Sequence, residues 1–293
     1  MSNYSIWVCE YSWVTNYNKS AAVYGAHNQG YLKLPYCYVL IKGNNHIAMV
    51  NVGYNHKEYG NLLADKFGVE NWRSPKVVLS ELGIIPEDVD TCFITHAHFD
   101  HFRNVEDFSN AKFYIQEREI AKWVRAMSLP KRLSWMMVAV DPDDIVRGVE
   151  LARDGRLVTV NGDMKDVLPG IDLRADDDTH TWGSMWVSVR NDSSESSDDK
   201  WILAGDVIYQ FDNIEDIADN KGVYNPVGLA VGSQANLVMA TEEMMKDVNY
   251  ESRRIIPTHE ERLKEVFPSR TTKEDLKITE ICLADGEQSR VIS

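Results

Sequence analysis

Short apolar runs separated by polar turns dominate the first half of the chain. The runs are rich in β-branched and aromatic residues, a composition typical of strands, and they cover residues 6–13, 36–41, 46–52, 91–95 and 111–115. Asn44 and Asn45 separate two of these runs and predict a tight hairpin turn. The segment 74–82 has an early proline and a following glycine, which are the start and stop signals of a helix.

The second half shows the same order of strands before helices. Strands are predicted at residues 157–160, 171–175, 185–189, 201–204 and 253–257, and helices at 234–246 and 260–266. The polar segment 190–200 predicts a solvent-exposed hairpin loop. No linker and no internal repeat divides the chain, so we expect a single domain over residues 1–293. The simplest architecture is α+β, with two sheets packed face to face and helices outside.

Charge and composition narrow the partners. The 293 residues include 31 Lys and Arg against 45 Asp and Glu, a net charge of −14, which argues against nucleic acid or an anionic membrane as the main partner. The chain contains no run of about 18 apolar residues, and its first residues lack the pattern of a signal peptide. The four cysteines are widely spaced and predict scattered thiols of a reducing compartment. We therefore expect a cytoplasmic protein.

The strongest chemical signal is the segment T-H-A-H-F-D-H at residues 95–101, directly after an apolar strand. It places four candidate metal ligands in six positions: His96, His98, Asp100 and His101. Alternate histidines on an extended segment point the same way, while Asp100 and His101 fall at the following turn and can face a second ion. The segment therefore predicts part of a metal site.

One segment cannot close a metal site alone, and three partners follow. His180, Asp206 and His259 each lie where the chain enters or leaves a predicted strand. A rigid sheet commonly holds functional groups at such positions. We expect these residues to converge on the 95–101 segment.

In the order H-x-H-x-D-H, His, Asp, His, the chain resembles the metallo-β-lactamase superfamily of αββα hydrolases. The resemblance implies that His96, His98 and His180 hold one metal ion and that Asp100, His101 and His259 hold another, with Asp206 bridging them. It implies two divalent ions, zinc in the first place, with iron, manganese or cobalt as alternatives.

Tyr209, three residues after Asp206, is similar to a tyrosine of the N-acyl-homoserine-lactone lactonase branch, where the hydroxyl meets the substrate carbonyl. The bridging Asp206 differs from the cysteine of the β-lactamases, and His98 stands where flavin-linked di-iron reductases have a glutamate. Two departures concern the surroundings of the site. Asn51 stands where the family usually has an aspartate, and the bulky Phe102-Arg103 pair replaces small residues and is expected to narrow the pocket.

These features predict a dinuclear metal-dependent hydrolase in which a metal-bridging hydroxide attacks an electrophilic carbon and Tyr209 donates to the carbonyl oxygen. The resemblance to the lactonases implies that Asp100 moves a proton to the leaving alkoxide. A lactone resembling N-acyl-homoserine lactone is the expected substrate. The alternatives are an ester, amide, phosphotriester or nitroaryl ether, an iron oxidoreductase on the same scaffold, and a binding protein without turnover.

The pocket is expected to admit a small apolar or aromatic molecule. Its candidate walls are the apolar segment 117–140 and the region 211–230. Core packing is the favoured explanation of segment 117–140, and a pocket wall or a dimer contact is the alternative. We expect a homodimer, with a hetero-oligomer as the alternative. His27, His46 and His56 belong to no motif and are expected to be non-catalytic.

Overall fold

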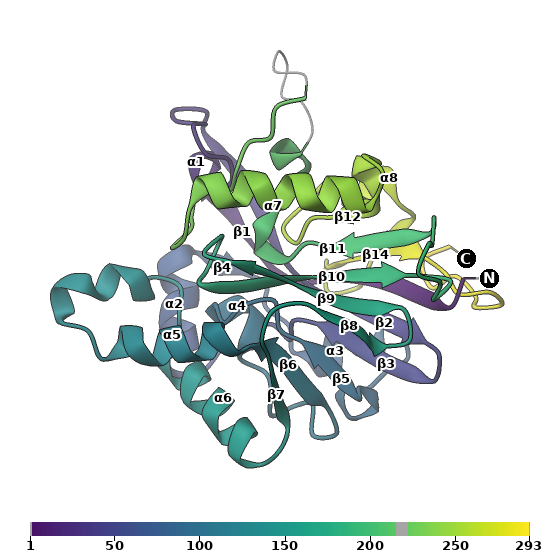
Figure 1. Cartoon of the computed structure of the whole chain (residues 1–293), viewed down its shortest axis with the longest axis horizontal. Coiled ribbons are helices and arrows are strands. Elements are labelled where there is room, and N and C mark those ends of the chain that lie inside the picture. The colour runs from purple at the N-terminus through teal and green to yellow at the C-terminus, as the bar shows by residue number, and fades with distance from the viewer. Residues whose placement is uncertain (1, 215–221, 293) are drawn as a thin grey trace.

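Two mixed β-sheets form the centre of the molecule in a computed structural model that describes residues 2–214 and 222–292 (Figure 1). Within those residues the first sheet has nine strands in the order β13-β14-β1-β2-β3-β5-β6-β7, with β4 paired to β1. Its strands are β1 (Tyr4–Asn18), β2 (Tyr31–Gly43), β3 (His46–Val50), β4 (Val69–Glu70), β5 (Thr91–Phe93), β6 (Lys112–Gln116), β7 (Leu157–Val160), β13 (Ser269–Thr271) and β14 (Lys277–Cys282).

The second sheet has the order β12-β11-β10-β9-β8. Its strands are β8 (Met164–Leu168), β9 (Ile171–Asp177), β10 (Gly183–Arg190), β11 (Lys200–Leu203) and β12 (Ile255–Ile256). Strands β8 to β11 are antiparallel neighbours, whereas β12 runs parallel to β11. The carboxyl ends of β11 and β12 therefore lie at the same edge of the sheet, where the residues that follow these strands can meet.

Helices cover both outer faces of this pair of sheets. They are α1 (Lys19–Ala22), α2 (Glu58–Phe67), α3 (Pro75–Ser80), α4 (Phe99–Phe102), α5 (Glu117–Met127), α6 (Pro142–Arg153), α7 (Gln234–Asp247) and α8 (Leu263–Val266). Short 3₁₀ turns are η1 (Pro86–Asp88), η2 (Lys131–Met137), η3 (Gly205–Val207), η4 (Phe211–Asn213) and η5 (Ser252–Arg254). Helix α7 lies along the second sheet, α3 and α6 pack against the first, and α5 with η2 projects to the left in Figure 1. The predicted αββα sandwich is confirmed.

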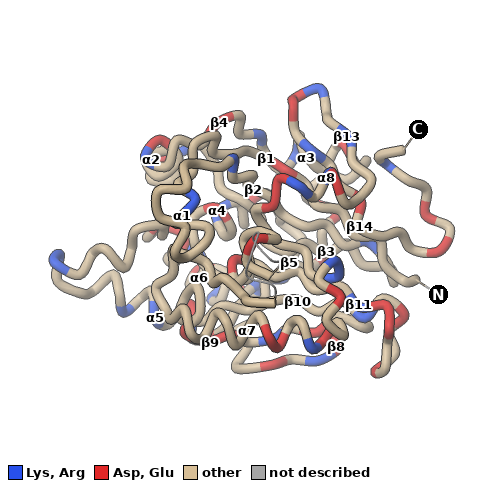
Figure 2. Tube along the Cα trace, turned by 90° about the horizontal axis from the view of Figure 1, so that it is seen from above, with Lys and Arg blue, Asp and Glu red and all other residues tan. Residues whose placement is uncertain are grey.

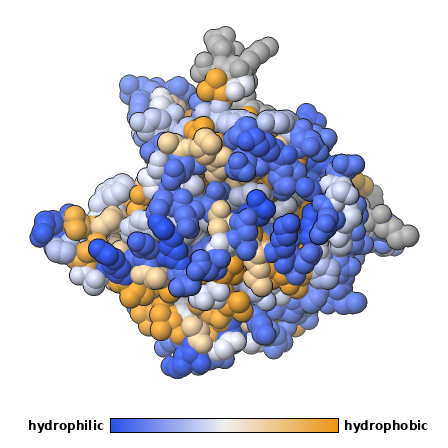
Figure 3. All heavy atoms as spheres, viewed as in Figure 1, coloured by the Kyte–Doolittle hydropathy of each residue, from blue (hydrophilic) through white to orange (hydrophobic). Residues whose placement is uncertain are grey.

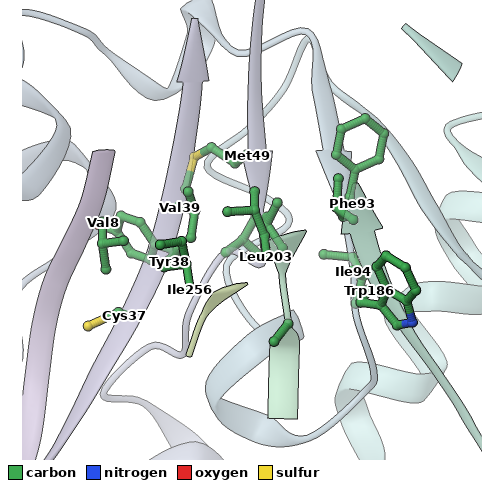
Figure 4. Packing of buried hydrophobic residues seen from close by; sticks show 14 of the residues in the cluster. Val8, Cys37, Tyr38, Val39, Met49, Phe93, Ile94, Trp186, Leu203 and Ile256 are labelled. Carbon is green, nitrogen blue, oxygen red and sulfur yellow. The ribbon is translucent and has the colours of Figure 1, made fainter. Parts of the chain in front are cut away.

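The main core lies between the two sheets. Val8 and Val39 of the first sheet face Leu203 and Ile256 of the second, and all four side chains are buried (Figure 4). Burial of this apolar layer is the main force that holds the sheets together. Charged residues of both signs are interspersed along the outer helices and loops (Figure 2).

Local structure follows the predicted signals at several places. Asn44 and Asn45 form the turn between β2 and β3 with φ of 48° and 62°, the left-handed pair that a tight hairpin requires. The predicted strand at 157–160 joins the first sheet as β7, parallel to β6, and not the second batch of strands that follows it in sequence. Helices α5 and α6, which precede it, form the connection that a parallel strand requires.

Two further sequence expectations concern the whole chain. All four cysteines are free, and Cys9, Cys37 and Cys92 are buried. Among the described residues, no helix combines the length and the apolar character needed to cross a bilayer.

Candidate metal centre

The seven residues singled out in the sequence lie together at one end of the sandwich and form two groups. His96, His98, His180 and Asp206 form the first group, in which all four candidate ligand atoms lie within 4.8 Å of one another. Within this group, Nε2 of His180 and Nδ1 of His98 are 3.0 Å apart. Asp100, His101 and His259 form the second group, with Asp100 Oδ2 3.3 Å from His101 Nε2 and 3.9 Å from His259 Nε2. All seven side chains are buried.

The carboxylate of Asp206 lies between the two groups. Its Oδ1 atom is 3.2 Å from Nε2 of His101 and 3.3 Å from Nε2 of His259. Its Oδ2 atom is 3.4 Å from Nε2 of His180 and 3.6 Å from Nε2 of His96. Each oxygen therefore faces one group, which is the arrangement that a bridging carboxylate needs.

Strand ends place these side chains. The 95–101 segment leaves β5, and α4 begins at Phe99, so His96 and His98 lie before this short helix and Asp100 and His101 lie within it. His180 lies in the turn between β9 and β10, Asp206 follows β11, and His259 follows β12. Gly205 has φ of 55°, and a Cβ there would lie 2.8 Å from Cβ of Thr95. Only glycine allows the end of β11 to approach the end of β5 this closely.

Hydrogen bonds orient two of the imidazoles. Nδ1 of His259 donates to the carbonyl oxygen of Pro35 at 2.7 Å, which leaves Nε2 free to face Asp206. Nδ1 of His96 is 3.1 Å from the Thr95 hydroxyl, and the amide oxygen of Asn51 accepts from that hydroxyl at 3.1 Å and from the Thr95 N–H at 2.9 Å. Asn51 thus supports His96 through Thr95, because an amide oxygen accepts these hydrogen bonds without the negative charge of an aspartate.

Burial keeps the three imidazoles of the first group uncharged. It lowers the pKa of His96 well below its ordinary value, and it lowers the pKa of both His98 and His180 to about 3. These imidazoles are therefore neutral near pH 7, the form that binds a metal.

The centre between the groups favours positive charge. Burial lowers the pKa of His101, but the carboxylates of Asp100 and Asp206 outweigh burial and raise this pKa to about 10. Burial raises the pKa of Asp206, but the charges of His101 and His259 outweigh it and hold this pKa well below its ordinary range. Both carboxylates are therefore suited to a neighbouring cation.

The donor set fits a pair of divalent metal ions. Nε2 of His96 is a buried atom without a hydrogen-bond partner in the described part of the chain. Unpartnered buried polar atoms are costly unless a ligand satisfies them. Imidazole and carboxylate donors suit zinc, iron, manganese or cobalt.

A small cavity opens over the two groups. Apart from the ligands themselves, its lining is mostly apolar and aromatic: Tyr17, Leu34, Tyr36, Phe67, Phe99, Ala139, Tyr209 and Leu229. The cavity therefore offers an apolar wall next to the candidate ligands.

Tyr209 lies beside the candidate ligands. Its ring centroid is 4.7 Å from that of His259 and 5.6 Å from that of His180. Burial and then the charge of Asp206 raise the pKa of its hydroxyl well above the ordinary value, so the hydroxyl stays a hydrogen-bond donor. Tyr17 brings a second hydroxyl to this cavity, hydrogen-bonded to Tyr209. No motif marks Tyr17 in the sequence, where it is one aromatic residue among several in a long strand.

The predicted narrowing of the pocket by Phe102 and Arg103 is wrong. Phe102 is fully buried, and its ring lies against Gly148 of α6, on the side of α4 away from the cavity. Arg103 is also buried and bonds to Asp144 Oδ1 through Nη1 at 3.0 Å. Alternate residues of a helical turn face different sides, so the metal ligands and these bulky residues do not compete for space.

Of the two segments predicted to line the pocket, 117–140 and 211–230, only some residues lie at the cavity. Ala139 lines the cavity, and Trp123 is fully buried with its ring centroid 6.0 Å from that of His98. Trp135 is 61% exposed on the projecting arm, where it cannot line the cavity. In the region 211–230, Leu229 lines the cavity, and residues 215–221 lie outside the described residues.

His27, His46 and His56 lie outside both metal groups. His46 Nδ1 is 3.2 Å from Asp90 Oδ1, and the ring of His56 stacks on Trp72. These contacts account for two of the three histidines without a role in the site.

The family model of the metallo-β-lactamase superfamily matches residues 34–259, a span that contains every candidate ligand. The chain therefore belongs to this superfamily. It is 27% identical over 145 residues to the N-acyl homoserine lactonase AiiB of Agrobacterium fabrum, a match that covers 50% of each protein. The chain thus spans about half the length of this curated relative.

Solved structures agree on the fold. An N-acyl homoserine lactone hydrolase with the product N-hexanoyl-L-homoserine at its catalytic metal centre has a TM-score of 0.65 at 16% identity, covering 91% of this chain and 97% of that one. The dizinc quorum-quenching lactonase AidC has a TM-score of 0.64 at 13% identity, covering 94% of each chain.

Proposed function

We propose that this protein is a dinuclear metal-dependent hydrolase that opens a lactone ring carrying an apolar acyl group. The observation that carries the proposal is the buried carboxylate of Asp206, whose two oxygens face two separate His/Asp groups beneath an apolar cavity. The names of the relatives support a lactone as the substrate class.

The chain's own residues define the remaining parts of the reaction. Bound divalent ions would supply a Lewis acid for the carbonyl group and would lower the pKa of water towards neutrality. The Tyr209 hydroxyl donates to the carbonyl oxygen, and Asp100 carries a proton to the alkoxide that leaves when the ring C–O bond breaks. One water is consumed, and the product is a hydroxy acid.

The cavity wall selects the substrate by its apolar part. Leu34, Phe67 and Leu229 surround the space beside the ligands, so an acyl chain loses contact with water on binding. A flat aromatic ester would meet the same wall, which makes it the proper competitor in a substrate comparison.

Metal quantification with a matched pair of variants tests the metal part of the proposal. His98→Ala removes a ligand of the first group, whereas His56→Ala removes a histidine stacked on Trp72 outside both groups. We expect two ions per chain in the wild type and in His56→Ala, and loss of metal and activity in His98→Ala. A fully active preparation without detectable metal would overturn the proposal.

A substrate panel on the same preparation tests the lactone part. N-hexanoyl homoserine lactone, a nitrophenyl ester and a phosphotriester are compared by kcat/KM, with proton release or nitrophenol absorbance as the signal. The proposal expects the lactone to be preferred. Preference for the phosphotriester or the aryl ester would refute the lactone assignment and leave the metal-dependent hydrolase standing.

We also propose a cytoplasmic location and a homodimer, as expected from the sequence. The free cysteines support a reducing compartment. Figure 3 shows an apolar area over α6, whose exposed residues include Val146 and Val149, and this area supports self-association. Sedimentation analysis that finds a monomer at micromolar concentration would refute the dimer.

A further inference from the structure

Glu119 is a fully buried carboxylate near the start of α5 that belongs to neither metal group. Its Oε1 atom accepts from the N–H of Ala97 at 2.9 Å and from the indole N–H of Trp123 at 2.6 Å. Its Oε2 atom accepts from the hydroxyl of Thr181 at 2.9 Å and from the N–H of Gly183 at 2.8 Å. Such a fully satisfied buried carboxylate holds its donors firmly in place.

Two of the four donors lie in the two loops that carry the histidines of the first metal group. Ala97 lies between His96 and His98, and Thr181 directly follows His180. One side chain thus joins the loop after β5 to the turn between β9 and β10, which come from different sheets. Its position fixes the distance between those two loops.

Two packing contacts make this link close. A Cβ at Gly183 would lie 2.5 Å from the backbone nitrogen of Glu119, so the start of β10 touches the start of α5 in a way that only glycine allows. The indole that donates to Glu119, that of Trp123, has its ring centroid 6.0 Å from that of His98. The imidazole of His98 therefore lies next to the indole of Trp123, which Glu119 holds by a hydrogen bond.

The second metal group has separate supports. The N–H of Val52 donates to the carbonyl oxygen of His101 at 2.9 Å, and the hydroxyl of Tyr11 donates to the carbonyl oxygen of Asp100 at 2.6 Å. His259 is held through the carbonyl oxygen of Pro35. Loss of Glu119 should therefore affect the first group far more than the second.

We propose that Glu119 is a positioning residue for the metal ion of the first group, and that it holds His98 and His180 so that their nitrogens face one point. The inference rests on the proposed metal site. A carboxylate suits all the donors because it only accepts hydrogen bonds, whereas the NH₂ of a glutamine would face an N–H donor in either orientation. Glu119→Gln therefore breaks the link while it preserves the size of the side chain.

The test is a titration of the metal-free protein with Co²⁺, followed by visible absorbance and calorimetry. The matched control is Glu280→Gln, because Glu280 is also buried and accepts from an indole, that of Trp7, at 3.1 Å. We expect two Co²⁺ per chain in the wild type and in the control. In Glu119→Gln one Co²⁺ should bind as in the wild type and the other about 10- to 100-fold more weakly.

A gentler variant protects the test against misfolding. Thr181→Val removes one donor to Glu119 and should weaken the same Co²⁺ site by a smaller factor. Two unchanged Co²⁺ sites in Glu119→Gln would overturn the inference, and so would an equal weakening of both sites, because that would indicate a general structural role. A wild-type protein that binds no Co²⁺ would overturn the proposed metal centre itself, and the inference with it.

Discussion

Arg103, which replaces a small residue of the family pattern, is the centre of a buried ion network. Its side chain is 1% exposed, and the side chains of Asp144 and Asp141 beside it are 0% exposed. Nη1 of Arg103 lies 3.0 Å from Asp144, and Nε lies 3.9 Å from Asp141. Nη2 bonds to Glu58 at 2.7 Å, but that carboxylate is 63% exposed and contributes little. We predict that Arg103→Met, which keeps the apolar stem, strongly destabilises the protein.

The magnitude follows from the charges that the substitution leaves behind. Removing one partner of a buried ion pair costs about 3–5 kcal/mol, because the remaining charge is buried without compensation. At about 2–4 °C per kcal/mol, the thermal midpoint should fall by roughly 10 °C. Burial, and then the charge of Asp141, already raise the pKa of Asp144, and Arg103 opposes both. Without Arg103 this pKa rises further, so the defect should be larger at pH 8 than at pH 5.

Thermal unfolding of the metal-loaded protein at both pH values measures these effects. Arg153→Met is the matched control, since Arg153 pairs with Asp154 on the surface and is 69% exposed. The double variant Arg103→Met/Asp144→Asn should recover part of the loss, because it removes one of the uncompensated charges. A midpoint for Arg103→Met within 2 °C of the Arg153→Met control would refute the reasoning.

Three further predictions concern single side chains. Tyr209→Phe should lower kcat about 100-fold with both metal ions retained. The control Tyr4→Phe, which removes a hydroxyl bonded to Pro169 away from the site, should leave kcat unchanged. Equal kcat values in the two variants would exclude Tyr209 as the donor to the carbonyl oxygen. Burial raises the pKa of Asp176 from 3.8 to about 7, so the folded chain holds a proton that the unfolded chain has released, and stability is lost as the pH rises through this range. Asp176→Asn should therefore stabilise the protein above pH 7 by up to about 4 kcal/mol, with no gain below pH 4, and urea denaturation showing the opposite pH trend would contradict this. Asn51→Ala should lower the free energy of unfolding by about 2–4 kcal/mol in the same assay, because it removes two hydrogen bonds from Thr95 at a residue with φ of 63°. A decrease below about 1 kcal/mol would show that Thr95 finds other hydrogen-bond partners.

Local patterns in the sequence predict local structure well in this chain. The apolar runs become β1, β2, β3 and β5, and the paired asparagines become the hairpin turn because their left-handed conformation is a property of the residues themselves. The candidate ligands could be listed because histidine and aspartate have few other reasons to occur at such spacing. The structure brings these seven residues into two groups around Asp206.

Features that depend on contacts between distant segments could not be predicted. Leu157–Val160 joins the first sheet because a crossover through α5 and α6 returns it there, and its own composition is the same in either sheet. Glu119 and Tyr17 carry no motif, since their importance comes from the loops and hydroxyls they meet in space. The position of Phe102 could not be predicted because its ring lies against Gly148, on a side of the helical turn that the neighbouring ligand His101 does not face.

The division of the candidate ligands between the two sheets has a consequence for the integrity of the molecule. Residues 96–101 follow a strand of the first sheet, whereas His180, Asp206 and His259 follow strands of the second. Ions bound by both sets of ligands would therefore link the two sheets. An ion present at 100 times its dissociation constant adds about 2.7 kcal/mol of cohesion to the folded state. A chelator would then do more than stop turnover: it would loosen the sandwich at one end and make the chain easier for a protease to cut.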